Sequence, residues 1–155
     1  KDGDFVWARS IGGPFHETAY AVLSDSFDNV YCTGIFRDTV DFDPGDDSTF
    51  LIAKGNNDAY ILKLDKNGNY VWAKSFGSSN SDQGQGIIID NSNRVYLAGF
   101  FQDTVDFDPN QGTKEKISNG SSDVYVLRLI QQGTGSISME TLEFVQVFPN
   151  PNYGS

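Results

Sequence analysis

Basic residues, cysteine and histidine are all scarce in this chain of 155 residues. Eleven Lys and Arg stand against 21 Asp and Glu, which gives a formal net charge of −10 and a pI near 4.3. Nucleic acids and anionic membrane surfaces are polyanions that basic side chains must neutralise, so the composition argues against both as partners. Cys32 has no partner for an internal disulfide and His16 is the sole histidine, which excludes a zinc site built from Cys and His.

Long apolar runs are missing as well. No stretch reaches the roughly 18 consecutive apolar residues of a membrane-spanning helix, so no membrane insertion is expected. The chain opens with Lys1 and Asp2 instead of a methionine and a hydrophobic signal region, which favours a processed or cut product. One Met against 12 Phe, 7 Tyr and 16 Gly favours strands and turns over helices and predicts an all-β fold.

An internal repeat runs through most of the chain at an offset of 65 residues. Trp7 recurs as Trp72, and the block DTVDFDP at 38–44 recurs unchanged at 103–109. Because residues 3–66 align with 68–131 without a gap, the chain holds two copies of one structural unit.

Alternating hydrophobicity and turn residues predict up to four antiparallel strands in each unit. The expected strands are 19–25, 30–36, 58–64 and 69–76 in the first unit, and 84–90, 95–101 and 123–129 in the second. Asn67-Gly68 indicates a hairpin turn in which both central positions have positive φ. Strands that are apolar on both faces must be covered on both faces, and the radial stacking of four-stranded blades in a β-propeller achieves this.

About 20 residues separate the second and third predicted strands of each unit, at 38–57 and 103–122. A structureless loop of this length is uncommon inside a compact unit. Two short alternating segments, 39–43 and 48–53, flank the turn Pro44-Gly45-Asp46-Asp47 and predict a protruding hairpin or ordered flap.

The repeat resembles a known bacterial family. WARSIGG at 7–13 and WAKSFGS at 72–78, followed by NVYCTGIF or RVYLAGFF and by DAYILKLD or DVYVLRLI, are similar to the SBBP β-propeller repeat of secreted and surface proteins of Bacteroidota. The resemblance covers residues 3–130 and implies propeller blades, with no catalytic residues assigned.

The strand order predicts how the units assemble. Residues 4–11 match the fourth strand of a unit but have no preceding three, and the second unit has no fourth strand up to Leu129. Since propellers need about 4–8 blades, we expect either a longer parent chain or strand exchange between copies, which gives a ring or a filament. The expected organisation is a strand completing a neighbouring blade (1–11), a first blade (12–76), a second blade lacking its last strand (77–130), a linker (131–141) and a final segment (142–155).

The final segment resembles the opening of the type IX secretion sorting domain. The residues that carry this resemblance are VFPNPNYG, with Pro149, Asn150, Pro151 and Gly154 as the sorting motif. It implies export through the outer membrane to the cell surface or the medium. The alternating residues 142–148 could instead form an exchanged strand that adds to a neighbour's sheet edge.

Acidic residues are concentrated in the two long excursions. Carboxylate oxygens are the ligands that calcium prefers, so a calcium site is one interpretation and a solvated acidic edge is the other. The spacing is not that of an EF-hand loop, and no other cofactor is expected. The candidate calcium ligands are Asp41, Asp43, Asp46, Asp106 and Asp108.

The tripeptide Asp-Thr-Val at 38–40 and 103–105 resembles the O-glycosylation acceptor of Bacteroidota, which implies glycans on Thr39 and Thr104. The other interpretation is an ordinary β-branched strand residue at each position.

Catalysis has little support in the sequence. A nucleophile, a base and an orienting group are needed together, yet His16 lies alone in a polar turn and Cys32 lies mid-strand at the position of Leu97, as a core residue would. Trp7 and Trp72 could stack on sugars, but their equivalent positions favour blade packing.

These observations predict a non-enzymatic, secreted or cell-surface β-propeller repeat protein with a structural or adhesive role. Its expected partners are other copies of itself or further blades. The alternative is a propeller module that presents 38–57 and 103–122 to a glycan or a protein, and a glycoside hydrolase is a third class.

Overall fold

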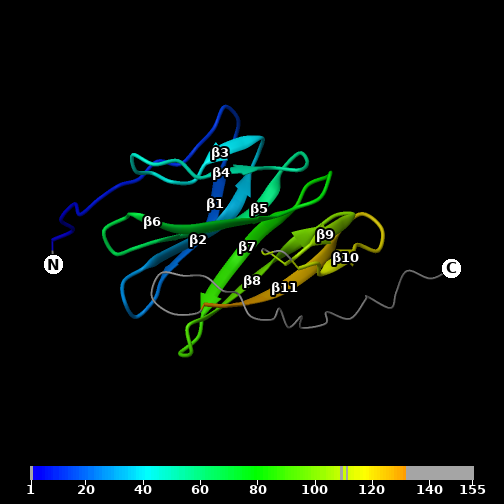
Figure 1. The fold of residues 1–155 in the computed structure, drawn as a ribbon. Helices are drawn as coiled ribbons and strands as arrows, with labels where there is room; N and C mark the ends of the chain where they lie inside the picture. The colour runs from blue at the N-terminus through cyan, green and yellow to red at the C-terminus, as the bar shows by residue number, and fades with distance from the viewer. Residues whose placement is uncertain (1, 109, 111, 132–155) are drawn as a thin grey trace.

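The computed structural model describes residues 2–108, 110 and 112–131. Within these residues the chain contains strands and turns and no helix, so the predicted all-β class is confirmed (Figure 1). The strands are β1 (Thr18–Ser24), β2 (Val30–Phe36), β3 (Thr39–Asp41), β4 (Phe50–Ile52), β5 (Asp58–Leu64), β6 (Tyr70–Phe76), β7 (Gln83–Ile89), β8 (Arg94–Phe101), β9 (Thr104–Asp106), β10 (Glu115–Ile117) and β11 (Asp123–Ile130).

The first unit forms a four-stranded antiparallel sheet with the order β1-β2-β5-β6. Its two central strands pair without a break from Val30 opposite Leu64 to Phe36 opposite Asp58. Both strands carry buried residues on both faces, because the second sheet covers one face of this sheet and the β3–β4 hairpin with Trp7 and Ile11 covers part of the other. The arrangement is that of one four-stranded blade.

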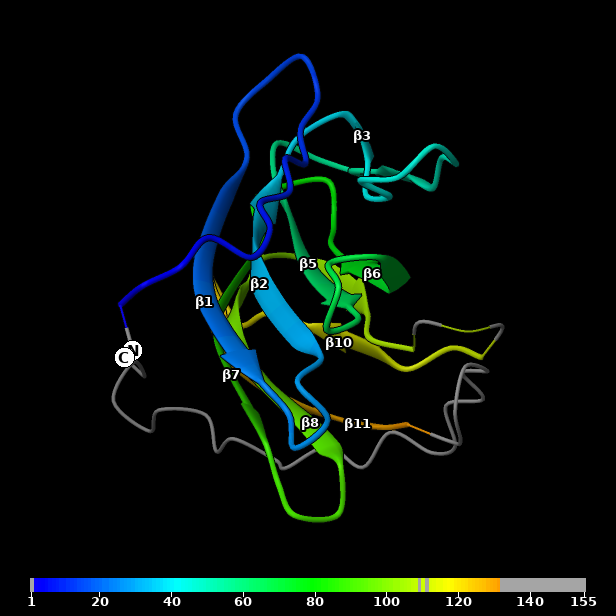
Figure 2. The same ribbon diagram turned by 90° about the vertical axis from the view of Figure 1, so that its left-hand side faces the viewer.

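The second unit forms a three-stranded antiparallel sheet with the order β11-β8-β7. β8 pairs with both neighbours, whereas β11 has β8 as its only strand partner among the described residues. Figures 1 and 2 show this sheet next to the first one, and β7 lies against both β1 and β2.

The two excursions each contain a short hairpin, as predicted. β3 pairs with β4 in the first unit and β9 with β10 in the second (Figure 1). Each hairpin turns its apolar side toward its own sheet, because Val40 and Phe42 are fully buried, and Val105 and Phe107 are buried at the equivalent positions.

Three hairpin turns share one design that differs from the predicted two-residue turn. In each turn the first residue is an aspartate whose Oδ1 accepts hydrogen bonds from two backbone N–H groups of the same turn. The fourth residue has positive φ, which Gly, Asn and Asp tolerate best. The aspartates are Asp25, Asp65 and Asp90, and the residues with φ of 62°, 77° and 60° are Asp28, Gly68 and Asn93. The prediction that both Asn67 and Gly68 have positive φ is therefore wrong, since Gly68 alone does.

Two hydrophobic clusters lie on opposite faces of the first sheet. One fills the space between the two sheets, where Tyr31, Ile61 and Trp72 meet Leu97 and Leu127. The other lies on the far face, where the β3–β4 hairpin, Trp7 and Ile11 cover Tyr60 and Leu62. We call the face with Tyr60 the front face of the first sheet and the face with Tyr31 its back face. The equivalent faces of the second sheet, with Tyr125 and Tyr96, take the same names.

The N-terminal segment differs from its prediction. Residues 4–11 form no strand in this structure, and only Gly12 makes an isolated bridge, to Asp41. The physical reason is that no strand among residues 2–108, 110 and 112–131 pairs with residues 4–11 to share backbone hydrogen bonds. Completion of a neighbouring blade by this segment stays a prediction.

Candidate functional site

The N-terminal segment is held on the first unit by specific contacts to the β5–β6 turn. The indole Nε1 of Trp7 donates a hydrogen bond to the carbonyl oxygen of Lys66 at 3.0 Å, and Arg9 Nε donates to the carbonyl oxygen of Gly68 at 2.9 Å. The Trp7 ring lies so close to Gly68 that a Cβ at residue 68 would stand 2.9 Å from ring atom Cδ2. Although this segment is no strand, it therefore has a defined place.

That place repeats the position of β6 one unit earlier. Trp72 and Phe76 of β6 pack in the cluster between the two sheets, and their equivalents at an offset of 65 are Trp7 and Ile11. Trp7 and Ile11 pack in the same way against the front face of the first sheet. The segment thus lies where the last strand of a preceding blade would lie.

The interface between the two sheets shows what a complete blade contact looks like. The second sheet turns its front face, with Leu97, Leu127 and Leu129, toward the back face of the first sheet. At the centre of this contact Gly84 lies so close to Thr33 that a Cβ at residue 84 would overlap the Thr33 hydroxyl. Thr33 is fully buried and donates a hydrogen bond to the carbonyl oxygen of Tyr60 at 2.6 Å.

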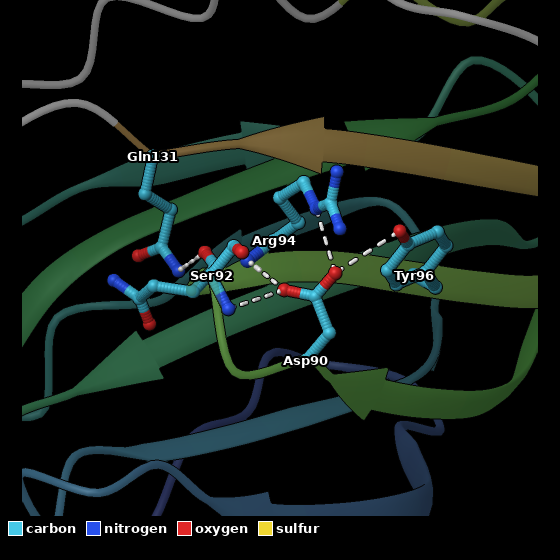
Figure 3. Close-up of polar contacts among 6 residues, drawn as sticks. Asp90, Ser92, Arg94, Tyr96 and Gln131 are labelled. Atoms are coloured by element: carbon cyan, nitrogen blue, oxygen red, sulfur yellow. Dashed lines mark hydrogen bonds and ion pairs between the residues drawn. The ribbon is translucent and has the colours of Figure 1, made fainter.

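Hydrogen bonds through Gln131, which lies beside the Asp90 turn of the second unit in Figure 3, close one end of the interface. Its Oε1 accepts hydrogen bonds from Tyr31 and Lys63 of the first sheet, and its Nε2 donates to the carbonyl oxygen of Asn93 in the second unit. Gln131 therefore connects the two units directly.

Figure 3 also shows the Asp90 turn beside this connection. Asp90 Oδ2 accepts a charged hydrogen bond from Arg94 Nε at 2.6 Å and another from the Tyr96 hydroxyl. Desolvation alone would raise the pKa of Asp90, but the bonds from Arg94, Ser92 and Tyr96 outweigh it and hold the pKa below its usual value.

On the front face of the first sheet, the space that corresponds to the one between Gly84 and Thr33 in the internal interface is open. A cavity of about 220 Å³ lies there, and its lining includes Ala19, Cys32, Phe42, Tyr60 and Glu17. Ala19 is the equivalent of Gly84, so the cavity lies where a preceding blade would place its counterpart of Thr33. Cys32, expected as a core residue, is only partly buried here, whereas Leu97 at the equivalent position is 1% exposed.

The back face of the second sheet is open as well. Ala59 of the first unit is fully buried, whereas its equivalent Val124 is 58% exposed. Thr33 is fully buried and its equivalent Ala98 is exposed. Tyr31 and Ile61 are also fully buried, and their equivalents Tyr96 and Val126 are partly exposed.

The outer edge of β11 borders this open back face. In the first unit the corresponding edge of β5 pairs with β6, from Ala59 opposite Phe76 to Leu64 opposite Tyr70. No strand within residues 2–108, 110 and 112–131 pairs with β11 on that side. An unpaired edge offers a row of N–H and C=O groups to an added strand.

Most of the candidate calcium ligands accept hydrogen bonds from backbone N–H groups of the hairpin turns in which they lie. Asp41 Oδ1 accepts hydrogen bonds from the backbone N–H groups of Asp43 and Thr49, and Asp43 Oδ1 accepts one from Gly45. Asp106 and Asp108 repeat this pattern in the second unit, while Asp46 lies exposed in the first hairpin. In the described part of the chain, no group of three or more His, Cys, Asp or Glu side chains is placed to hold a metal ion. Calcium binding stays a prediction.

The two predicted glycosylation positions lie at equivalent strand starts. Thr39 is partly buried and donates a hydrogen bond to Asp38, whereas Thr104 is exposed. The preceding residues, Asp38 and Asp103, have positive φ of 60° and 57°. The sorting motif Pro149, Asn150, Pro151 and Gly154 lies outside the described residues, as do the predicted linker beyond Gln131 and the final segment.

Two buried carboxylates at the junction of the units were not singled out by the sequence. Asp58 and Asp82 are each 1% exposed. Asp58 accepts hydrogen bonds from the backbone N–H groups of Lys54 and Gly55, and Asp82 accepts them from Ser78. Desolvation, aided by the negative charge of Asp82, raises the pKa of Asp58 to about 6. The aspartates belong to the joint between units, where loop 54–57 lies on residues 78–82.

The comparisons with known proteins agree with a repeat of the propeller type. The chain is 27% identical over 132 residues to an uncharacterized WD repeat-containing protein of Acanthamoeba polyphaga mimivirus, and the match covers 81% of this chain and 10% of that protein. No family model and no solved structure matches the chain. No helix long and apolar enough to span a membrane occurs among the described residues.

WD repeats form the four-stranded blades of β-propellers. The likeness and the sheet order together support a β-propeller-type repeat chain, which spans about a tenth of the relative's length. The SBBP repeat and the type IX sorting domain stay predictions.

Proposed function

We propose that this chain is a non-enzymatic β-propeller-type interaction module of a secreted or cell-surface protein, with a structural or adhesive role. It binds further β-blades through its open sheet faces and through the free edge of β11. The observation that carries the proposal is that the two ends of the described chain are complementary. One end is the segment with Trp7 and Ile11, which lies on the first sheet as the last strand of a preceding blade would, and the other is β11, whose outer edge pairs with no strand among the described residues.

The free edge can be tested with a synthetic strand. A fluorescent peptide of residues 68–77, which carries the sequence of β6, is titrated with the whole chain and followed by fluorescence anisotropy. We expect saturable binding because the peptide can add to β11 as β6 adds to β5. The matched control is the same peptide with alternate backbone amides N-methylated, which keeps the side chains and removes the hydrogen-bond donors. Equal binding of both peptides, or of neither, would contradict the proposal.

The Asp-Thr-Val tripeptides at 38–40 and 103–105 are the basis for a proposed covalent modification. We propose Thr39 and Thr104 as glycan acceptors, with Thr104 the more accessible of the two. Intact mass measurement on protein from its natural source tests this, since a mass equal to that of the unmodified chain would overturn it.

A second candidate function is supported by the outer side of the hairpins. Phe50 and Ile52 on β4 are 61% and 67% exposed, and Ile117 on β10 is 69% exposed, next to the acidic turns. Exposed apolar side chains rimmed by polar residues are typical of binding surfaces. In this alternative the hairpins bind a protein or a glycan. A glycan array probed with the wild-type chain and with Ile52→Glu tests it, because a hit that the variant retains would exclude this surface.

A further inference from the structure

We propose that copies of this chain stack head to tail, with the front face of the first sheet of one copy on the back face of the second sheet of another. This deepens the proposed function and rests on it, because it names the partner as a second copy. Both faces belong to the same repeat, and the chain already contains one contact of this kind between its own two sheets.

The internal contact gives the geometry of the external one. Inside the chain, Ile87 on the front face of the second sheet is 9% exposed because it packs against the back face of the first sheet. Its equivalent on the front face of the first sheet, Val22, is 69% exposed. A second copy placed by the same repeat step would cover Val22 with the open back face of its second sheet.

The small residues at the centre of the two contacts fit this arrangement. Inside the chain, Gly84 faces Thr33, and there is no room for a side chain at residue 84. Between copies the equivalent pair is Ala19 facing Ala98. One position gains a methyl group while its partner is reduced from threonine to alanine, so the combined volume stays nearly constant. Cores tolerate volume-conserving exchanges of this kind far better than one-sided changes.

The cavity is explained by the same arrangement. It is lined by Ala19 and Tyr60 on the front face, and one lining group, Glu17, has an oxygen with no hydrogen-bond partner among the described residues. In the internal contact the equivalent space is filled by the neighbouring sheet, as the closeness of Gly84 to Thr33 shows. A second copy therefore completes a contact that a single chain leaves partly empty.

The partner copy also receives a strand. Trp7 and Ile11 pack on the front face of the first sheet as Trp72 and Phe76 of β6 pack on the front of the second sheet, and β6 pairs with β5. In the stacked pair, residues 5–11 of one copy therefore lie beside β11 of the other and become its fourth strand. Because the contact joins two different faces, each added copy leaves one face of each kind free for the next copy. The copies therefore form a closed ring or an open filament.

Two arginine variants test this arrangement, because each blocks one face and leaves the other intact. Ala19→Arg blocks the front face and Ala98→Arg blocks the back face, while Ser121→Arg adds the same charge in an exposed turn as a control. The molar mass of each protein is measured by sedimentation velocity over a hundredfold range of concentration. High salt is included, since each copy carries a net charge of −10 and screening weakens the repulsion between copies.

We expect wild type and Ser121→Arg to form species above one chain mass of 17.1 kDa as concentration rises. Each face variant alone should associate at least about tenfold more weakly, because burying an unpaired charge is costly. An equimolar mixture of Ala19→Arg and Ala98→Arg should form dimers and nothing larger, since one free front face then meets one free back face.

Three results would overturn the inference. They are a wild type that stays at one chain mass, a mixture that stays monomeric while both variants are folded by circular dichroism, and a mixture that forms long assemblies. Should an arginine variant unfold, Val22→Glu and Val124→Glu replace it at exposed positions of the same two faces. A monomeric wild type that still binds the β6 peptide separates failure of this inference from failure of the proposed function.

Discussion

The contact between Gly84 and Thr33 gives the sharpest test of how the two units fit together. Gly84→Ala would normally stabilise a strand by about 0.4–1 kcal/mol, because alanine has less conformational freedom than glycine in the unfolded chain. Here the added methyl group would overlap the buried hydroxyl of Thr33, so the variant must displace a well-packed side chain. Overpacking of this kind costs about 1–3 kcal/mol. We therefore expect a net loss of about 1–2 kcal/mol in the free energy of unfolding.

The double variant removes the overlap. Thr33→Ala alone loses a buried hydrogen bond to the carbonyl oxygen of Tyr60, at a cost of about 1 kcal/mol. In Gly84→Ala combined with Thr33→Ala, the new methyl group occupies the space that the threonine vacates. The free energy of unfolding of the double variant should therefore be at least about 1 kcal/mol higher than the value obtained by adding the losses of the two single variants.

Urea unfolding followed by circular dichroism measures all four proteins of this cycle. The control is Ser121→Ala, an exposed turn position at which a small side-chain change should alter stability by less than about 0.5 kcal/mol. Additive single effects, or a Gly84→Ala variant as stable as the wild type, would refute the packing of the two sheets described above.

Three further predictions concern a buried charge, a turn and the core. The folded pKa of Asp58 is raised to about 6 from 3.8, so its stabilising contribution is complete below pH 3.8 and is lost as pH rises through 6. Relative to wild type, Asp58→Asn should therefore gain up to about 3 kcal/mol in the free energy of unfolding between pH 4 and 7, measured by urea titration; a difference that does not change with pH would contradict the raised pKa. Gly68→Ala should cost about 1–2 kcal/mol in thermal unfolding, because φ is +77° there and Trp7 covers the position; a neutral result would contradict the docking of Trp7. Phe107→Ala should cost about 3–5 kcal/mol by chemical denaturation, because the ring is fully buried between the second sheet and Phe76; a loss below about 1 kcal/mol would show that this hairpin does not form part of the core.

The strands were predictable because their signal is local. Alternation of apolar residues along 30–36 and 58–64 reproduces β2 and β5 residue for residue, and the repeat carries the same assignment to the second unit. The hairpins in the excursions were predicted somewhat too long, since β3 and β4 each contain three residues. Their outer residues belong to turns that aspartate side chains stabilise, as Asp41 does.

The turn type was mispredicted because the prediction relied on the pair Asn67-Gly68, whereas Asp65 and Gly68 define the turn. Asn67-Gly68 suggested a two-residue turn, yet the turn is defined by Asp65 at its start and by Gly68 at its left-handed position. Asp25 with Asp28 and Asp90 with Asn93 show the same spacing, so the comparison of all three turns would have identified it.

The open faces could not be read from the sequence, because equivalent residues have different surroundings. Ala59 and Val124 are both apolar strand residues, and only the presence of the second sheet next to the first makes one buried and the other exposed. Asp58 was equally inconspicuous among the many aspartates. Its burial depends on a loop from one unit lying on the connection to the next.

The Thr33 hydroxyl also limits the size of the residue that can lie opposite it on a neighbouring sheet. A first sheet that approached the back of another first sheet would bring Ala19 onto Thr33, and the alanine methyl group would need the same space as the hydroxyl. The back of each first unit is already covered by the second unit of its own chain, so the back of a second unit, with Ala98, is the face that remains open to the next copy. In any extended assembly the two kinds of unit therefore alternate because the chain joins them in that order, and alanine in place of threonine at residue 98 leaves room for Ala19 of the next copy.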